Sequence, residues 1–212
     1  MSSHNLFPQT GMRARPWHVA ALLLMALIAA AHAPPPQPAP RSVNTFEVAV
    51  RDYARMHRRL EGQIGPIEFG TPVAEINRII RELSAAIRAE RHDAAQGEFF
   101  TPDLAGVLRA RITDALLDHG YTADDVRAAA GVNGVDYDRV VLRVNETFPW
   151  VLASAMFACV LEVLPPLPPE LQYRIVGDDL VLIDVHASLV VDILPRALVD
   201  RTAEQAIEGG VP

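Results

Sequence analysis

The strongest constraint on the fold is a block of prolines near the C-terminal third of the chain, four in the five residues Pro165–Pro169. Proline lacks a backbone N–H and restricts the residue before it, so neither a regular helix nor a central strand crosses this block. Before it, apolar residues recur at spacings of three and four. After it, Leu171, Tyr173 and Ile175 alternate with polar residues. The sequence therefore predicts helices first and β-structure last.

Cap residues and glycines divide the first part of the chain into helices. Asn44 is placed to cap the first helix and Gly62 to end it, and Thr-Pro pairs open the second and third. The expected helices span 44–61, 72 to about 95, 102–119 and 122–130, and a short, buried, nearly all-apolar helix spans 150–164. Asn133-Gly134 predicts a turn, and residues 135–144 fit either helix or strand.

The alternating pattern after the prolines predicts a β-hairpin at about 171–194. Gly177-Asp178-Asp179 is a turn, Leu180–Val185 is the second strand, and Leu189–Leu194 is a third strand or a return helix. The expected fold is α+β and mainly α. Four to five packed helices are followed by a C-terminal β-hairpin or small three-stranded meander, in one domain over residues 44–200 with a polar tail at 201–212.

Residues 1–33 have the pattern of a secretory signal peptide. Arg13 and Arg15 precede an uncharged apolar run at 19–31, and cleavage is expected after Ala33. Met12 is an alternative start to Met1. Residues 34–43 form a proline-rich linker. The alternative is an uncleaved anchor, but thirteen helical residues span only about 20 Å of a hydrocarbon core of about 30 Å. After cleavage the protein would have no stable membrane span. We therefore expect an exported protein, either periplasmic or secreted.

Composition excludes several classes of function. The chain carries a formal charge of −7, and beyond residue 33 it has 17 arginines against 26 acidic residues, a net charge of −9. Such acidity argues against a nucleic-acid partner. All 19 basic residues are arginine, which excludes a Schiff-base or P-loop lysine. Cys159 is the one cysteine and lies in an apolar stretch, so we expect a buried, inert thiol and a core held by packing alone.

The segment 164–194, LPPLPPELQYRIVGDDLVLIDVHASLVVDIL, resembles the C-terminal segment of a group of small bacterial proteins that are predicted to be exported. The shared features are the proline-rich run, a tyrosine-arginine strand, a glycine turn and an aspartate-valine-histidine-alanine step. Upstream the resemblance is looser and is limited to Val144-Asn145 and Phe148-Pro149. The resemblance implies export and helices followed by a hairpin, and it implies no reaction.

Asp184 and His186 are the candidate catalytic pair. On one strand they would share a face, and an aspartate beside a histidine is the orienting arrangement of a general base or a metal ligand. Tyr173, Arg174 and Asp192 are candidate binding residues near them. The structural alternative is that Asp184 satisfies backbone groups of the following turn, at Ala187-Ser188.

Two weaker constellations have ordinary explanations. Asp114 and Asp118 share a helical face near His119, but at a helix C-terminus this pattern fits a solvated end. The arginines at 51, 55, 58 and 59 fit a solvated, ion-paired face or a grip on an anionic partner. With no paired Cys or His spacing, HExxH or EF-hand loop, the sequence predicts no metal site and no cofactor.

The leading functional interpretation is therefore an exported, non-catalytic bacterial protein that contacts another envelope protein or a second copy of itself. The alternative is an envelope enzyme or a small-ligand or metal binder that uses the region of Asp184 and His186. A third class is a helical protein anchored by its leader. The sequence leaves open whether the protein is an enzyme.

Overall fold

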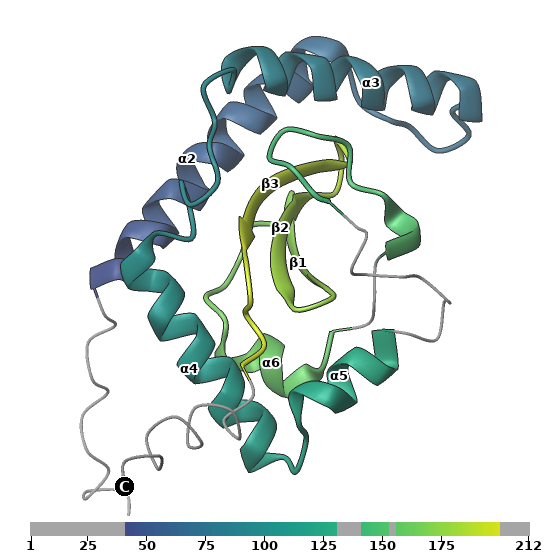
Figure 1. Cartoon of the computed structure of the whole chain (residues 1–212). Helices are drawn as coiled ribbons and strands as arrows, with labels where there is room; N and C mark the ends of the chain where they lie inside the picture. The colour runs from purple at the N-terminus through teal and green to yellow at the C-terminus, as the bar shows by residue number, and fades with distance from the viewer. Residues whose placement is uncertain (1–40, 131–140, 153–155, 200–212) are drawn as a thin grey trace, which may run out of the picture. The chain divides into compact units, whose positions relative to one another are not determined.

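The computed structural model describes residues 41–130, 141–152 and 156–199 (Figure 1). These residues form five α-helices, one short 3-10 helix and a three-stranded antiparallel sheet. The elements follow the order α2 (Arg41–Ile64), α3 (Val73–Glu90), α4 (Pro102–Asp118), α5 (Ala123–Ala130), η3 (Trp150–Leu152), α6 (Ala158–Val163), β1 (Leu171–Val176), β2 (Asp179–Asp184) and β3 (Leu189–Leu194). The α+β, mainly helical fold with a C-terminal meander is confirmed.

The first described helix, α2, begins at Arg41 and not at Asn44. Asn44 lies inside the helix with an exposed side chain, so its expected capping role is wrong. The helix is longer because Val43 is buried on the same stripe as Phe46, and packing of this extra residue favours helical backbone before position 44. It also passes Gly62 and ends at Ile64, just before Gly65, whose φ of 109° is accessible mainly to glycine.

The starts of the next three helices follow the predicted residues with one exception. The hydroxyl of Thr101 accepts the N–H of Leu104 and caps α4, and Thr122 and Asp125 exchange hydrogen bonds at the start of α5. Thr71 does not cap α3, because its side chain is engaged by the backbone of Glu68. The helix α3 also ends at Glu90, earlier than predicted.

The expected single helix at 150–164 is wrong. The described residues of this stretch form η3 and α6, and extended backbone at Phe157 precedes α6. Just before η3, the Phe148 N–H donates to the carbonyl of Ser188, and Thr147 bridges to Leu189. These contacts tie the segment to the sheet, so long-range pairing prevails over local helix propensity. The predicted turn at 133–134 and most of the ambiguous 135–144 segment lie outside the described residues.

The three strands pair in chain order, with Tyr173 opposite Leu182 and Asp184 opposite Leu189. The third strand at 189–194 is thus confirmed, and the alternative of a return helix is excluded. A bulge between Leu182 and Ile183 shifts the β2–β3 register. It places Leu182 opposite Asp192.

Apolar side chains cover both faces of the sheet. Leu180 and Leu182 belong to the larger core cluster with Phe46 of α2, while Val181 and Ile183 belong to a second cluster with Phe148. This separation follows from the period of two along a strand. Within the helices, α2 packs against α3 and α4, and α4 packs against α6. The C-terminal half of α2 thereby meets the core that the sheet also borders.

Cys159 is buried and unpaired, as its apolar surroundings indicated. Among the described residues, no helix is both long and apolar enough to cross a membrane. The expected leader at 1–33, the linker up to residue 40 and the tail at 201–212 lie outside the described residues. The last linker residues, 41–43, belong to α2.

Candidate functional site

The centre of the candidate site is His57, on the buried face of α2. Tyr53 precedes it by one helical turn and is buried on the same face. The His57 side chain has no solvent exposure at all. Since a buried imidazole needs partners for both ring nitrogens, the surroundings of these two atoms decide what the residue does.

Asp184, the last residue of β2, faces the Nδ1 atom of His57. Its Oδ2 lies 2.6 Å from that nitrogen and also accepts the hydroxyl of Tyr53 at 2.8 Å. Its Oδ1 accepts the backbone N–H groups of His186 and Ala187 at 3.0 and 2.8 Å. An ionised carboxylate only accepts hydrogen bonds, so Nδ1 of a neutral His57 carries the proton and Nε2 presents its lone pair.

The Nε2 atom of His57 is buried and has no hydrogen-bond partner. The nearest acidic atom is Oε2 of Glu61, one turn further along α2, at 3.6 Å. The other Glu61 oxygen lies 3.0 Å from Nδ1 of His186, which sits in the turn between β2 and β3. The rings of His57 and His186 are 5.3 Å apart between centroids.

His57, Glu61 and His186 each offer one ligand atom, and these three atoms all lie within 4.8 Å of one another. Imidazole nitrogen and carboxylate oxygen are ligands that zinc and related divalent ions accept. Metal-bound histidines commonly donate their second ring N–H to a carboxylate, which is the place that Asp184 occupies. The residues that could hold a metal are therefore His57, Glu61 and His186, with Asp184 orienting His57.

Electrostatics favour positive charge at this place. Burial lowers the pKa of His57, but the hydrogen bond and charge of Asp184, with the charges of Glu61 and Glu170, outweigh it and place that pKa above its ordinary value. Burial and the neighbouring Asp184 carboxylate raise the pKa of Tyr53 well above the ordinary range. Tyr53 therefore stays a hydroxyl donor to Asp184 at any physiological pH.

A cleft of about 630 Å³ opens beside the three residues. Glu61 and His186 lie on its wall, whereas His57 lies behind them and is not part of the lining. The apolar part of the wall comes from the loop after α2, from α3 and from the residue that follows β2. It consists of Pro66, Ile67, Ile79, Ile80, Leu83 and Val185. The cleft gives small molecules access to the exposed side of the cluster.

Of the predicted site residues, Asp184 and His186 do lie together, but not as one strand face. His186 is in the turn, and its ring contacts Glu61, while Asp184 holds the His186 backbone N–H. Asp184 thus satisfies turn backbone at Ala187, as the structural alternative stated, and at the same time binds His57. The two interpretations of Asp184 are compatible because its two oxygens serve different partners.

The three candidate binding residues have other contacts. Tyr173 stacks on Phe46 and donates its hydroxyl to the carbonyl of Pro165. Arg174 donates to the carbonyl of Tyr173, and partial burial lowers its pKa. Both oxygens of the fully buried Asp192 accept backbone N–H groups: those of Gly97, Phe99, Phe100 and Ile193. These contacts fit structural roles, since each anchors backbone or core.

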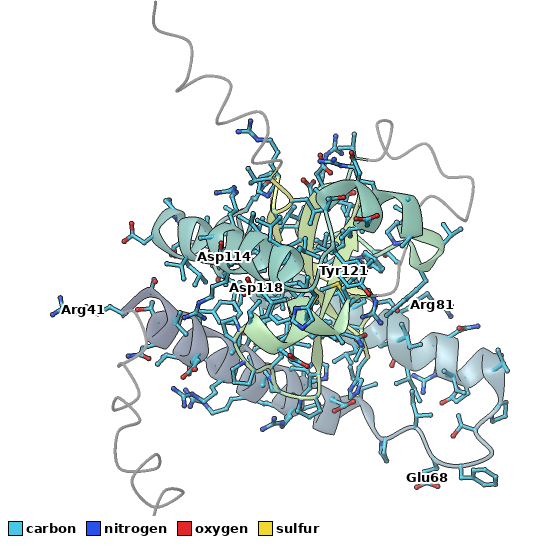
Figure 2. The ribbon with its side chains drawn as sticks, turned by 90° about the horizontal axis from the view of Figure 1, so that it is seen from below. Arg41, Glu68, Arg81, Asp114, Asp118 and Tyr121 are labelled. Carbon is cyan, nitrogen blue, oxygen red and sulfur yellow. The ribbon has the colours of Figure 1, made fainter. Side chains whose placement is uncertain are left out.

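Asp114 and Asp118 lie along α4 (Figure 2), and the ring of His119 contacts the carbonyl of Ala115. Across the described ranges, His57, Glu61 and His186 bring three ligand atoms within 4.8 Å of one another, and Asp114, Asp118 and His119 do not. Three of the α2 arginines have acidic partners: Arg55 pairs with Asp52, Arg58 with Glu170 and Arg59 with Glu90.

Sequence reasoning missed His57 as a functional residue and Glu61 as its neighbour. The available signal was their spacing: four residues apart on a helix, they share one face. A histidine on an apolar stripe with a carboxylate one turn later is, however, common on ordinary helices. Its significance depends on Asp184 and His186, which are more than 120 residues away along the chain.

Comparison with known proteins finds no relative from which a role for this site could be inferred. The chain matches no protein-family model, no curated protein and no solved structure. The class that the fold and site define is thus a small α+β protein with a His-Glu-His cluster at a cleft.

Proposed function

We propose that this protein binds a divalent transition-metal ion, with zinc as the best match, through His57, Glu61 and His186. The observation that carries the proposal is the Nε2 atom of His57, which is buried without a hydrogen-bond partner while Asp184 orients the ring from the other side. A buried nitrogen without a hydrogen-bond partner lowers the stability of the folded protein. A cation between His57 and Glu61 would remove this cost.

The spacing of the donor atoms fits a small ion. Two ligands at about 2.1 Å from a tetrahedral zinc lie roughly 3.4 Å from each other. Nε2 of His57 and Oε2 of Glu61 are 3.6 Å apart, too far for a good hydrogen bond but close to this value. The Glu61–His186 contact of 3.0 Å is a hydrogen bond that metal binding would replace.

The ordinary alternative is a protonated His57 that forms a buried ion pair with Asp184. In that case Nε2–H would also need an acceptor, and none lies within hydrogen-bond distance among the described residues. The set of two nitrogens and one oxygen matches zinc better than calcium or magnesium, which prefer oxygen ligands. Three protein ligands leave one position of a tetrahedral ion for water or another molecule.

The test is a zinc titration of the untagged full-length chain, stripped of metal, against a chromophoric chelator. We expect one zinc per chain and a melting temperature that rises with zinc concentration. His186→Ala should weaken binding at least tenfold, and its side chain is exposed enough for the fold to survive. His92→Ala is the matched control, an exposed histidine paired with Asp93. Equal affinities of the two variants, or no zinc-dependent stabilisation, would contradict the proposal.

Export and a role in protein contacts form a separate proposal. Its support is the leader-like pattern of residues 1–33 and the proline-rich linker. Mass spectrometry of the mature N-terminus, with a crosslinked pull-down from the envelope of a bacterial host, tests it. A start near Pro34 and one dominant partner would support it, and an intact leader would contradict export by cleavage. A metal site is compatible with either result.

A further inference from the structure

We infer that the cleft beside the metal cluster binds a small molecule with an apolar body and a carboxylate head, and that the head completes the coordination of the ion. This inference rests on the proposed metal site and names its ligand class. It is carried by the placement of the three ligand residues relative to the cleft wall.

The free position of the ion would face the cleft. His57 has no solvent exposure and lies behind the wall, whereas Glu61 and His186 are partly exposed and line it. Asp184 and Tyr53 close the buried side of His57, since both are hydrogen-bonded there and buried. A fourth ligand therefore has access from the cleft and not from the core.

The charge of the cluster favours an anionic head. Glu61 is the one charged ligand among the three, so with His57 and His186 neutral the ion and its direct ligands together keep one positive charge. The Asp184 carboxylate contacts the far ring nitrogen of His57, on the buried side, and does not contact the ion directly. Arg58, the one arginine among the described residues of the cleft lining, already binds Glu170 through two nitrogen atoms. The ion, and not Arg58, would thus provide the positive charge for a carboxylate.

The remaining wall favours an apolar body. A cavity of about 630 Å³ falls within the range of small-molecule sites. Ile67, Ile80 and Val185 line it and are partly or well exposed, and Ile79 and Leu83 line it as buried residues. Each methylene buried against such a wall strengthens binding about fourfold. Alkyl chains of several carbons are therefore expected to bind far better than a short carboxylate.

The experiment compares octanoate with acetate by calorimetry on the zinc-loaded full-length chain. We expect octanoate to bind at least tenfold more tightly than acetate, and the zinc-free chain to lose most of this affinity. N-acetyl-leucylleucine in a parallel titration distinguishes the C-terminus of an apolar peptide from a fatty acid as the source of the carboxylate. Tighter binding of either one than of acetate supports the inference and identifies the source.

Variants of the wall separate this inference from the metal site. Ile67→Ser and Ile80→Ser should each reduce the preference for octanoate several-fold and leave zinc affinity unchanged. Val48→Ser is the matched control, because Val48 and Ile67 are exposed to nearly the same extent, 49% and 48%, and Val48 lies outside the cleft lining.

Two results would overturn the inference while the metal site stands. One is zinc binding in which neither octanoate nor N-acetyl-leucylleucine binds more tightly than acetate. The other is binding of these two carboxylates that does not depend on zinc. Failure of zinc itself to bind in the chelator competition would overturn the proposed function, and this inference with it.

Discussion

The imidazole of His57 and the carboxylate of Asp184 are both fully buried and lie 2.6 Å apart, although 127 residues separate them in the chain. One comes from the C-terminal half of α2 and the other from the end of β2. This contact joins the helical part of the protein to its sheet and fixes the direction in which His57 presents its second nitrogen.

Replacing Asp184 by asparagine tests this orienting role. Asp184→Asn keeps the size but loses the charge that four donors share, so we expect zinc affinity to fall about 10- to 100-fold. Urea denaturation should show that the free energy of unfolding falls by about 2 kcal/mol. Tyr53→Phe is the comparison, because it removes one donor to the same oxygen. We expect this variant to lose about 1 kcal/mol of unfolding free energy and its zinc affinity to change by only a few-fold. Similar zinc affinities for both variants would refute the orienting role.

The aromatic contact between helix and sheet should dominate the stability of the larger core. Phe46 of α2 is 1% exposed and stacks on Phe100 and on Tyr173 of β1. Phe46→Ala should lower the free energy of unfolding by about 3–5 kcal/mol, measured by urea denaturation. On the same helix, Val48→Ala changes an exposed residue and should stay within about 0.5 kcal/mol. Comparable losses from both would mean that α2 does not pack as described.

Asp192 is expected to act as a structural anchor and not as a ligand residue. Its two oxygens accept four backbone N–H groups, three of them from the segment before α4. Asp192→Asn would turn an amide N–H₂ toward N–H donors, so we expect a loss of about 2–3 kcal/mol in unfolding free energy and no change in zinc affinity. The exposed Asp52, paired only with Arg55 in the described contacts, supplies the control Asp52→Asn, expected within about 0.5 kcal/mol. A weakened zinc site in Asp192→Asn would disprove the assignment.

Asp179, the first residue of β2, should make the stability of the fold depend on pH. Burial raises the pKa of Asp179 above its ordinary value of 3.8, and the charge of Asp178 adds to this, against the opposing hydrogen bond from the Arg196 N–H. The folded state therefore holds this proton more tightly than the unfolded chain. Stability falls as pH rises from 3.8 through the raised pKa, and the full cost is present at neutral pH.

Asp179→Asn removes this cost and keeps an oxygen for Arg196. We expect its melting temperature at pH 7 to exceed that of the unchanged chain by on the order of 2 °C, with the difference shrinking as the pH falls through the raised pKa towards 3.8. Thermal unfolding followed by circular dichroism across this range is the measurement. Asp93→Asn, at a side chain 91% exposed, should show no such trend. A difference that persisted unchanged in acid would rule out this origin.

Local sequence patterns predicted much of the fold because their causes are local. The proline block, the alternation at Leu171, Tyr173 and Ile175, and the cap at Thr101 each act within a few residues, and the structure confirms them. The predicted helix at 150–164 is wrong because the hydrogen bond from Phe148 to Ser188 in the β2–β3 turn and the Thr147–Leu189 bridge, about 40 residues away, override the local pattern.

The sequence by itself thus determined the order of helices and strands and marked Asp184 and His186 as a pair of interest. Only the tertiary structure decided what these two residues face. An imidazole and a carboxylate act together only when they are in contact. The packing of α2 against the sheet brings His57 and Glu61 to Asp184 and His186. No spacing within one helix or one strand encodes that contact, because it depends on how the whole core closes.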